Sequence, residues 1–229
     1  MPGTLFIQEE TEMTNALDIE IKNSKNIPRY IFGEGSIDNL KSLLLERNDN
    51  KSGYAVYFID IFFEKNVSPL ESLPISSSDQ VFYVDTQNEP TTSYIDDLKN
   101  RLMNINKSLP HTIIGIGGGC TLDVAKAISN LLTNIGNAED YQGWDLVKFP
   151  GTYKIGIPTI SGTGAEATRT CVMINPSNGL KLGMNSDHTV FDQIILDPGL
   201  TITVPRDQFF YTGMDTFIHC VESLSGNYR

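Results

Sequence analysis

The spacing of apolar residues divides the chain into short buried segments and longer amphipathic ones. Apolar runs rich in β-branched and aromatic residues, suited to strands buried on both faces, are found at residues 53–60, 81–84, 112–116, 154–158 and 194–198. Between these runs, apolar residues recur every three or four positions, most clearly at 91–106 and 122–132, which predicts helices. The alternation predicts an α/β fold with a Rossmann-like, doubly wound and mostly parallel sheet covered by helices on both faces.

Local signals add detail to this outline. Ser36 precedes a helical pattern and is expected to cap it. Residues 61–80 and 134–150 are expected to be loops. Trp144 lies in the second of these, where a Trp is more often a packing anchor than a ligand contact. A polar turn within residues 171–183 predicts a β-hairpin.

The character of the sequence changes twice along the chain. Residues 1–26 are polar and acidic and are expected to form a leader or an edge strand, with alternation at 17–21. Residues 27–205 carry the clear strands and are expected to form one dinucleotide-binding α/β domain. Residues 206–229 are helical in pattern, which predicts the first helix of a second, helical domain.

Composition and charge exclude several classes of function. The net charge of −11, with only 17 Lys and Arg among 229 residues, argues against a nucleic-acid partner. No apolar run reaches the ~18 residues of a membrane span. The first residues lack the charged flank and apolar core of a signal peptide, so a cytoplasmic protein is expected, without a membrane partner. The three cysteines show no spacing typical of a disulfide framework or a cysteine zinc site.

The segment with the clearest chemistry is the glycine turn after the strand at 112–116. Gly117, Gly118 and Gly119 allow the backbone to turn sharply and to approach a ligand closely. The helix behind them directs unpaired N–H groups and the positive end of its dipole to the same place. A phosphate group is the expected ligand.

Two other strand ends also carry polar groups. Asp60 ends the strand at 53–60, where a carboxylate can accept hydrogen bonds from an adenosine ribose, and a solvated aspartate is an equally good interpretation. The strand at 154–158 continues into hydroxyl and glycine residues at 159–164, which suit a phosphate or a carboxamide, or form a turn without a ligand.

Asp215 and His219 are four residues apart in the final helical segment, so their side chains project from one face. A carboxylate and an imidazole in this arrangement can supply two ligands of a divalent metal. The same spacing is more often a hydrogen bond or a solvated face.

Four ordered segments resemble the iron-containing (group III) alcohol dehydrogenases, over about residues 28–229. They are Gly117-Gly118-Gly119-x-x-x-Asp123-x-Ala125-Lys126, Pro158-Thr159-x-Ser161-Gly162-Thr163-Gly164-Ala165-Glu166, Asp197-Pro198 and Gly213-Met214-Asp215-x-x-x-His219. The resemblance implies a metal-dependent alcohol dehydrogenase or oxidase that uses NAD(P) and a divalent metal, iron or zinc. It also implies a homodimer in the full-length form.

The same resemblance implies roles for individual residues. Gly117, Gly118 and Gly119 would hold the pyrophosphate, with Asp123 in the helix behind them. Contacts with phosphate, ribose or nicotinamide would come from Thr159, Ser161 and Thr163. Lys181 would approach the ribose, and Asp60 would hold the adenosine ribose and favour NAD over NADP. The first two metal ligands, and the catalytic residues, would be Asp215 and His219.

Three further segments, at residues 141–145, 185–193 and 211–215, resemble one branch of this family. That branch oxidises the terminal C8 alcohol of 3-deoxy-D-manno-octulosonate (Kdo) to an aldehyde, in the biosynthesis of 8-amino-Kdo for lipopolysaccharide. The implied partner is a small sugar acid. Candidates for meeting its carboxylate are Arg169, Lys148 and Arg206.

The chain departs from the family pattern in two respects. The family's helical domain supplies two more histidines to the metal, whereas this chain ends at Arg229, which predicts a truncated form. Cys120 stands where the family commonly has Ser. The alternative hypotheses are a non-catalytic nucleotide-binding fragment, or a relative such as a glycerol dehydrogenase, a general alcohol dehydrogenase or a dehydroquinate synthase.

Overall fold

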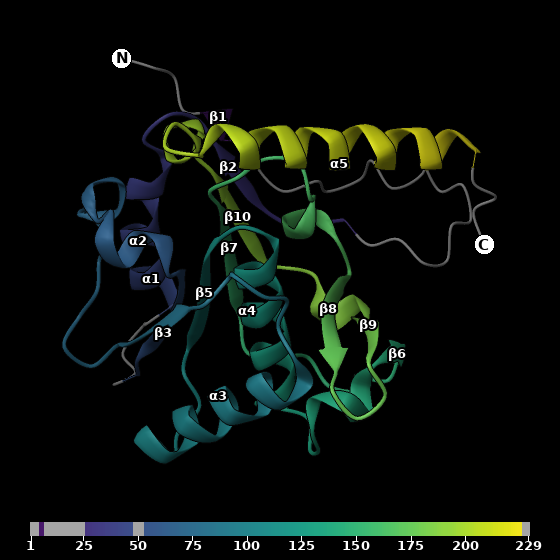
Figure 1. Cartoon of the computed structure of the whole chain (residues 1–229). Coiled ribbons are helices and arrows are strands. Elements are labelled where there is room, and N and C mark those ends of the chain that lie inside the picture. Colours follow the sequence, from purple (N-terminus) through teal and green to yellow (C-terminus); the bar gives the residue numbers. More distant parts are fainter. Residues whose placement is uncertain (1–4, 7–25, 48–52, 226–229) are drawn as a thin grey trace, which may run out of the picture.

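The computed structural model describes residues 5–6, 26–47 and 53–225 and is built on a seven-stranded sheet (Figure 1). The strand order is β1-β2-β10-β7-β5-β3-β4, and every pair except β1 with β2 is parallel. The strands are β1 (Leu5–Phe6), β2 (Tyr30–Phe32), β3 (Ala55–Asp60), β4 (Gln80–Val84), β5 (Thr112–Gly117), β7 (Lys154–Pro158) and β10 (Gln193–Leu196). The predicted mostly parallel sheet is confirmed, and the alternating segment at 17–21 lies outside the described residues.

Helices cover both faces of this sheet, as the alternation of elements predicted. One face packs against α3 (Thr92–Ile105) and α4 (Gly119–Leu131), and the other against α1 (Leu40–Arg47) and α2 (Phe62–Lys65). Side chains of a strand alternate between the two layers. Along β3, Val56 and Phe58 therefore join the core beneath α3 and α4, while Tyr57 and Ile59 join the core beneath α1 and α2.

Close packing fixes α4 against β5. A Cβ atom at Gly115 would lie 2.8 Å from the Cβ of Ala125, closer than real side chains approach one another. The glycine on the strand and the small alanine on the helix therefore let the two backbones come together. As a result, the first turn of α4 lies directly beyond the carboxyl end of β5.

The direction in which the chain adds strands reverses between β3 and β5. From β3 the chain adds β4 on one side, then crosses back so that β5, β7 and β10 follow on the other. Open α/β sheets bind their ligands at such a reversal, outside the carboxyl ends of the strands. Asp60 ends β3 and Gly117 ends β5, and a Cβ atom on Gly117 would lie 3.0 Å from that of Asp60.

A second sheet of three strands is formed by one short strand that precedes β7 and two strands that lie between β7 and β10 in the chain. It contains β6 (Gly143–Trp144), β8 (Thr170–Asn175) and β9 (Leu180–Asn185) in the order β6-β9-β8. Strands β8 and β9 are antiparallel, which confirms the predicted hairpin. Cys171, Met173 and Met184 are buried in the core beneath α4, so this sheet is joined firmly to the larger one.

The helix start near Ser36 differs from the expectation. Gly35, in the left-handed region at φ 75°, occupies the cap position, and Ser36 makes no capping hydrogen bond. The carboxylate of Asp197, far along the chain, accepts the N–H groups of Gly35 (3.2 Å) and Ile37 (3.1 Å) instead. A distant acid thus binds backbone N–H groups at the start of this helix, where a local serine was expected to provide the cap.

The two expected loops contain more structure than their sequences indicated. Residues 61–80 include α2 and a 3-10 turn at Ser68–Leu70, and residues 134–150 include a 3-10 turn at Ala138–Tyr141 and strand β6. Trp144 is 62% exposed, so the prediction that it is a packing anchor is wrong.

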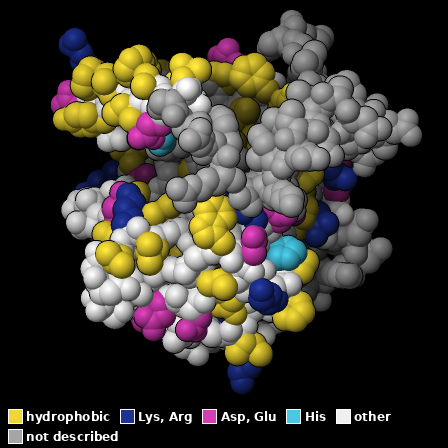
Figure 2. Space-filling model, turned by 90° about the vertical axis from the view of Figure 1, so that its right-hand side faces the viewer, with side chains coloured by type: hydrophobic (Ala, Val, Ile, Leu, Met, Phe, Trp, Pro, Cys, Tyr) yellow, Lys and Arg dark blue, Asp and Glu magenta, His cyan; other side chains and the backbone are white. Residues whose placement is uncertain are grey.

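The last described helix, α5 (Arg206–Ser225), lies across the carboxyl end of the sheet (Figure 1). The Thr216 hydroxyl donates to the Gly162 carbonyl oxygen at 3.1 Å and ties the helix to the turn after β7. Large apolar side chains of α5 are exposed, among them Phe209, Phe210, Phe217 and Leu224. Hydrophobic atoms accordingly gather along the top of the molecule, over this helix, in Figure 2. No helix in the described ranges is long and apolar enough to cross a membrane.

Candidate functional site

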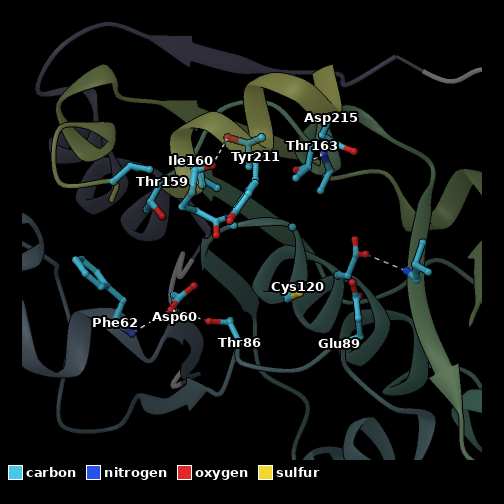
Figure 3. A pocket seen from close by; sticks show the side chains of 18 of the residues that line it. Asp60, Phe62, Thr86, Glu89, Cys120, Thr159, Ile160, Thr163, Tyr211 and Asp215 are labelled. Carbon is cyan, nitrogen blue, oxygen red and sulfur yellow. Dashed lines mark hydrogen bonds between the residues drawn. The ribbon is translucent and has the colours of Figure 1, made fainter. Parts of the chain in front are cut away.

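A cavity of about 860 Å³ lies between the carboxyl ends of the strands and the underside of α5. Asp60 and Thr86 lie at one end of it, Asp215 and Thr163 at the other, and Cys120 between them (Figure 3). The cavity therefore occupies the place where the reversal of strand order predicts a ligand.

The glycine turn forms the floor of this cavity. Gly117 ends β5, Gly118 takes the cap position of α4 without a capping side chain, and the helix begins at Gly119. Its first backbone hydrogen bond runs from Leu122 N to Gly118 O at 3.0 Å, so the N–H groups of the first turn point beyond the helix. Gly118 and Gly119 line the cavity, and this end of a thirteen-residue helix suits a phosphate.

Two of these glycines cannot be replaced by larger residues without movement. A Cβ on Gly118 would lie 3.0 Å from Ile160 Cγ2, and one on Gly119 would lie 3.3 Å from Thr163 Oγ1. The turn is therefore pressed against the segment after β7. The lack of side chains keeps the first-turn N–H groups accessible to a ligand.

Asp60 is held in position at the end of β3. Its Oδ1 accepts the backbone N–H of Phe62 at 3.0 Å and the hydroxyl of Thr86 at 3.2 Å. Burial raises the pKa of Asp60, and these two hydrogen bonds partly oppose the rise. Because only Oδ1 is engaged in these bonds, the carboxylate retains capacity to accept from a ligand hydroxyl.

Asp123 lies one turn into α4 and lines the same cavity. Its Oδ2 accepts the N–H of Val172 at 2.9 Å, whereas its Oδ1 is buried and has no partner within the described chain. Burial raises the pKa of Asp123 to about 6, and the nearby Lys126 ammonium acts in the opposite direction. An unpaired buried oxygen of this kind calls for a ligand donor such as a hydroxyl or an amide.

Cys120 is a protonated thiol at neutral pH. Burial, together with the carboxylates of Glu89 and Asp123, raises its pKa to about 11. A thiol in this state is a poor nucleophile, so Cys120 acts as a small wall residue of the cavity.

The segment after β7 supplies only part of what the sequence predicted. Thr159 is buried, and its N–H donates to Gly117 O at 3.1 Å. Thr159, Ile160 and Thr163 line the cavity. Ser161 is exposed and does not line it, because the backbone turns away at that position. The structure therefore brings two of the three predicted hydroxyl residues to the site.

Lys181 reaches the cavity from β9. Its Nζ lies 2.8 Å from Glu89 Oε1, in an ion pair that joins β9 to the loop after β4. Both residues line the cavity. In the described residues, Lys181 is the one Lys or Arg of the lining, against five carboxylates, which are Asp60, Glu89, Asp123, Asp207 and Asp215.

Asp215 and His219 also face the cavity, from α5. They are one turn apart, with 3.8 Å between Asp215 Oδ2 and His219 Nδ1. One carboxylate and one imidazole suit iron or zinc by type. The described residues nevertheless hold no group of three or more potential metal ligands, and a catalytic metal usually has at least three protein ligands. Within the described residues this pair by itself therefore does not make a complete metal site.

Two cavity features escaped the sequence interpretation. Glu89 lies in a polar loop that carries no recognisable signal. Lys126 is fully buried and binds the wall segment 165–170. The buried Lys126 could have been found from the sequence, because it is a lysine inside an otherwise apolar helix, three residues after an aspartate.

The parallel sheet, the glycine turn at a helix N-terminus and the acidic strand end define a dinucleotide-type α/β domain. The model of one family, iron-containing alcohol dehydrogenase, matches residues 28–198, three quarters of the chain. The chain belongs to this family of oxidoreductases. The family assignment confirms the coarser part of the sequence resemblance.

Curated relatives and solved structures agree with this assignment. Sulfoacetaldehyde reductase of Bilophila wadsworthia is 37% identical over 156 residues, covering 68% of this chain and 40% of the relative. 1-Propanol dehydrogenase of Citrobacter freundii is 32% identical over 200 residues, covering 85% and 47%. The chain thus spans less than half the length of these relatives.

Among solved structures, a 1,3-propanediol oxidoreductase shares the fold with a TM-score of 0.73 at 23% identity, covering 86% of this chain and 52% of that one. A sulfoacetaldehyde reductase from Bifidobacterium kashiwanohense, solved in complex with NAD+, gives a TM-score of 0.69 at 24% identity, covering 84% and 50%.

Proposed function

We propose that this chain is the cofactor-binding half of an NAD-linked, metal-dependent alcohol dehydrogenase. The observation that carries the proposal is that the first turn of α4 and the Asp215–His219 pair of α5 line one and the same cavity. A cofactor held on one side and a metal-bound alcohol on the other would meet inside it. The family membership, with the NAD+ complex of one related structure, supports the choice of cofactor.

In this proposal the N–H groups at the start of α4 bind the pyrophosphate, since they combine unpaired donors with the positive end of the helix dipole. Asp60 accepts hydrogen bonds from the hydroxyls of the adenosine ribose. A 2′-phosphate there would meet a buried carboxylate in a cavity with few positive charges, which favours NAD over NADP.

The other end of the cavity would receive the nicotinamide ribose and carboxamide. Thr159 and Thr163 offer hydroxyls, Lys181 offers an ammonium, and Asp123 offers the unpaired acceptor Oδ1. Ser161, exposed and outside the lining, has no role in this arrangement.

Asp215 and His219 would supply two ligands of the metal. A metal bound there would act as a Lewis acid on the alcohol oxygen. The remaining ligands must come from outside the described residues, so we include a helical domain beginning at residue 206, and a homodimer of the full-length form, in the proposal. The exposed apolar side chains of α5 are those expected of a helix that packs against further helices.

For the substrate we propose the C8 alcohol of Kdo, on the resemblance of residues 141–145, 185–193 and 211–215 to the branch that oxidises it. The third segment carries Tyr211 and Asp215 into the cavity lining. The first two meet instead at the small sheet, where Trp144 pairs with Asn185.

None of the three candidates for the substrate carboxylate lines the cavity. Arg169 forms ion pairs with Asp145 and Asp187, and Lys148 donates to a backbone carbonyl. Arg206 precedes the lining residues of α5. A small primary alcohol or aldehyde is therefore the second candidate, because the similar proteins include a 1-propanol dehydrogenase and a sulfoacetaldehyde reductase.

The test is a calorimetric titration of NAD into the 229-residue chain, alone and with Fe(II) or Zn(II). Asp215→Ala is compared with Asp207→Ala, which removes another cavity carboxylate from the same helix. NAD binding supports the cofactor role, and a metal effect lost only in Asp215→Ala supports the metal site. NAD binding indifferent to metal identifies a nucleotide-binding fragment without catalysis, and absence of binding refutes the proposal. NAD reduction with Kdo, compared with 1-propanol, then decides the substrate.

A further inference from the structure

Lys126 is a charged residue in the interior of the protein. It lies in the middle of α4 and has no exposed surface. Its Nζ donates, at 2.5–3.0 Å, to the carbonyl oxygens of Ala165, Thr168 and Thr170 and to the Thr168 hydroxyl. The Phe191 ring centroid lies 5.3 Å from the same ammonium. Every N–H of the ammonium can therefore be engaged.

All of these acceptors belong to one segment of the cavity wall. Ala165, Thr168 and Thr170 line the cavity, and they connect the turn after β7 to β8. This segment has little regular structure, with a single 3-10 turn at Ala165–Ala167. Charge-assisted hydrogen bonds to several of its carbonyls replace the backbone pairing that a helix or strand would provide.

Asp123 lies three residues earlier on the same side of α4, close enough for its carboxylate and this ammonium to act on each other electrostatically. Burial raises the pKa of Asp123, and Lys126 opposes this rise. Burial lowers the pKa of Lys126, and Asp123 opposes that fall. Other titratable or charged groups acting on the pair are Cys171, Glu166 and Lys154 around Lys126, and Glu89 and Lys181 around Asp123.

We propose that Lys126 is a positioning residue of the cavity. It fastens wall segment 165–170 to α4 and is the counter-charge against which Asp123 presents an ionised, unpaired Oδ1 to the ligand. The consequence for NAD rests on the function proposed above, while the hold on the wall and on Asp123 is a property of the chain itself.

The experiment compares wild type with Lys126→Met and Lys126→Arg. Lys99→Met is the matched control, because Lys99 also donates to a backbone carbonyl, that of Gly136, from helix α3 and outside the cavity lining. Three readouts are taken on the 229-residue chain. They are hydrogen-exchange protection factors at 166–172, the Asp123 pKa from ¹³C NMR of labelled aspartate, and the NAD affinity.

In Lys126→Met we expect the protection factors at 166–172 to fall and the Asp123 pKa to rise by about one unit or more. NAD should bind about ten- to a hundredfold more weakly, the loss expected when a hydrogen bond to a charged group is removed. Lys126→Arg should restore the Asp123 pKa, and Lys99→Met should leave all three readouts unchanged. A folded Lys126→Met protein with wild-type protection and an unchanged Asp123 pKa overturns the proposal.

If Lys126→Met does not fold, the proposal is tested with Asp123→Asn, by measuring the protection of the wall as a function of pH. Without the carboxylate, Lys126 should lose its proton at lower pH, so the protection of the wall should fall as pH rises, unlike in wild type. A protection profile identical to wild type at every pH overturns the proposal. If wild-type protein fails to bind NAD while the variants show the expected changes at the wall and at Asp123, the proposed function is refuted and the positioning role stands.

Discussion

Gly162 lies at the junction between the turn after β7 and helix α5, and its replacement by alanine tests what holds the metal-ligand pair in place. A Cβ atom here would overlap the Thr212 carbonyl oxygen and lie 2.8 Å from the carbonyl carbon and Cβ of Thr212. These are two backbone atoms and a Cβ atom, whose positions do not depend on the side-chain rotamer. No rotamer change therefore relieves the overlap. The φ of 134° is also unfavourable for alanine.

The size of the effect follows from two terms. An unfavourable φ costs about 1–3 kcal/mol, and overpacking against a fixed neighbour adds about 1–3 kcal/mol. The helix is tied to this turn by the hydrogen bond from Thr216 to Gly162, worth about 1 kcal/mol. Displacing α5 is therefore cheaper than keeping the overlap, and Gly162→Ala should move Asp215 and His219 away from the cavity while the sheet stays folded.

The displacement of α5 is tested by hydrogen exchange, measured by mass spectrometry over residues 206–225. Denaturant unfolding of the same samples gives the unfolding free energy. Gly164→Ala is the control, because Gly164 also has a positive φ, of 65°, but no atom within 4 Å of its added Cβ. We expect both variants to lose about 1–3 kcal/mol of unfolding free energy from backbone strain. Only Gly162→Ala should lose protection along α5. Equal protection of α5 in the two variants would refute the reasoning.

Three further predictions concern charge, cofactor choice and surface. Asp123→Asn should remove a pH dependence of stability. The pKa of Asp123 in the folded protein, about 6, exceeds the usual value of 3.8, so the unfolding free energy of wild type falls by about 2–3 kcal/mol as pH rises from 4 to 6. Denaturant unfolding across that window should show a flatter dependence of the unfolding free energy on pH for the variant. Parallel pH dependences of variant and wild type would contradict the prediction. Asp60→Ser should reduce the preference for NAD over NADP about tenfold or more, measured by titration with both, and an unchanged ratio would exclude Asp60 from the ribose site. The chain should self-associate through α5, and Phe210→Lys with Phe217→Lys should reduce this in light scattering; a monodisperse wild-type monomer that melts cooperatively would count against it.

Much of the fold could be predicted because the relevant physics is local. β-Branched runs between amphipathic segments are suited to buried parallel strands, and β3, β5 and β7 lie where such runs predicted strands. The turn at 117–119 combines three glycines with a following helix, so its position at a helix N-terminus was readable as well. The hairpin of β8 and β9 followed from its polar turn.

Expectations failed where a residue's partner is distant in sequence. Ser36 was expected to cap a helix, but Asp197, from the end of β10, accepts backbone N–H groups at the start of that helix instead. Trp144 was expected to be a packing anchor on a loop, yet it lies in the short strand β6 and is exposed. Ser161 shares a hydroxyl-rich segment with Thr159 and Thr163, but the turn directs it away from the cavity.

The sequence by itself determined the order of strands and helices, the glycine turn and the spacing of Asp215 and His219, because periodicity, glycine freedom and the pitch of a helix act within a few residues. Only the tertiary structure decided that α5 lies over the carboxyl end of the sheet, that Glu89 pairs with Lys181, and that Lys126 is buried against the wall of the cavity. These contacts join segments far apart in the chain. Their geometry depends on how whole elements pack, and no local pattern encodes it.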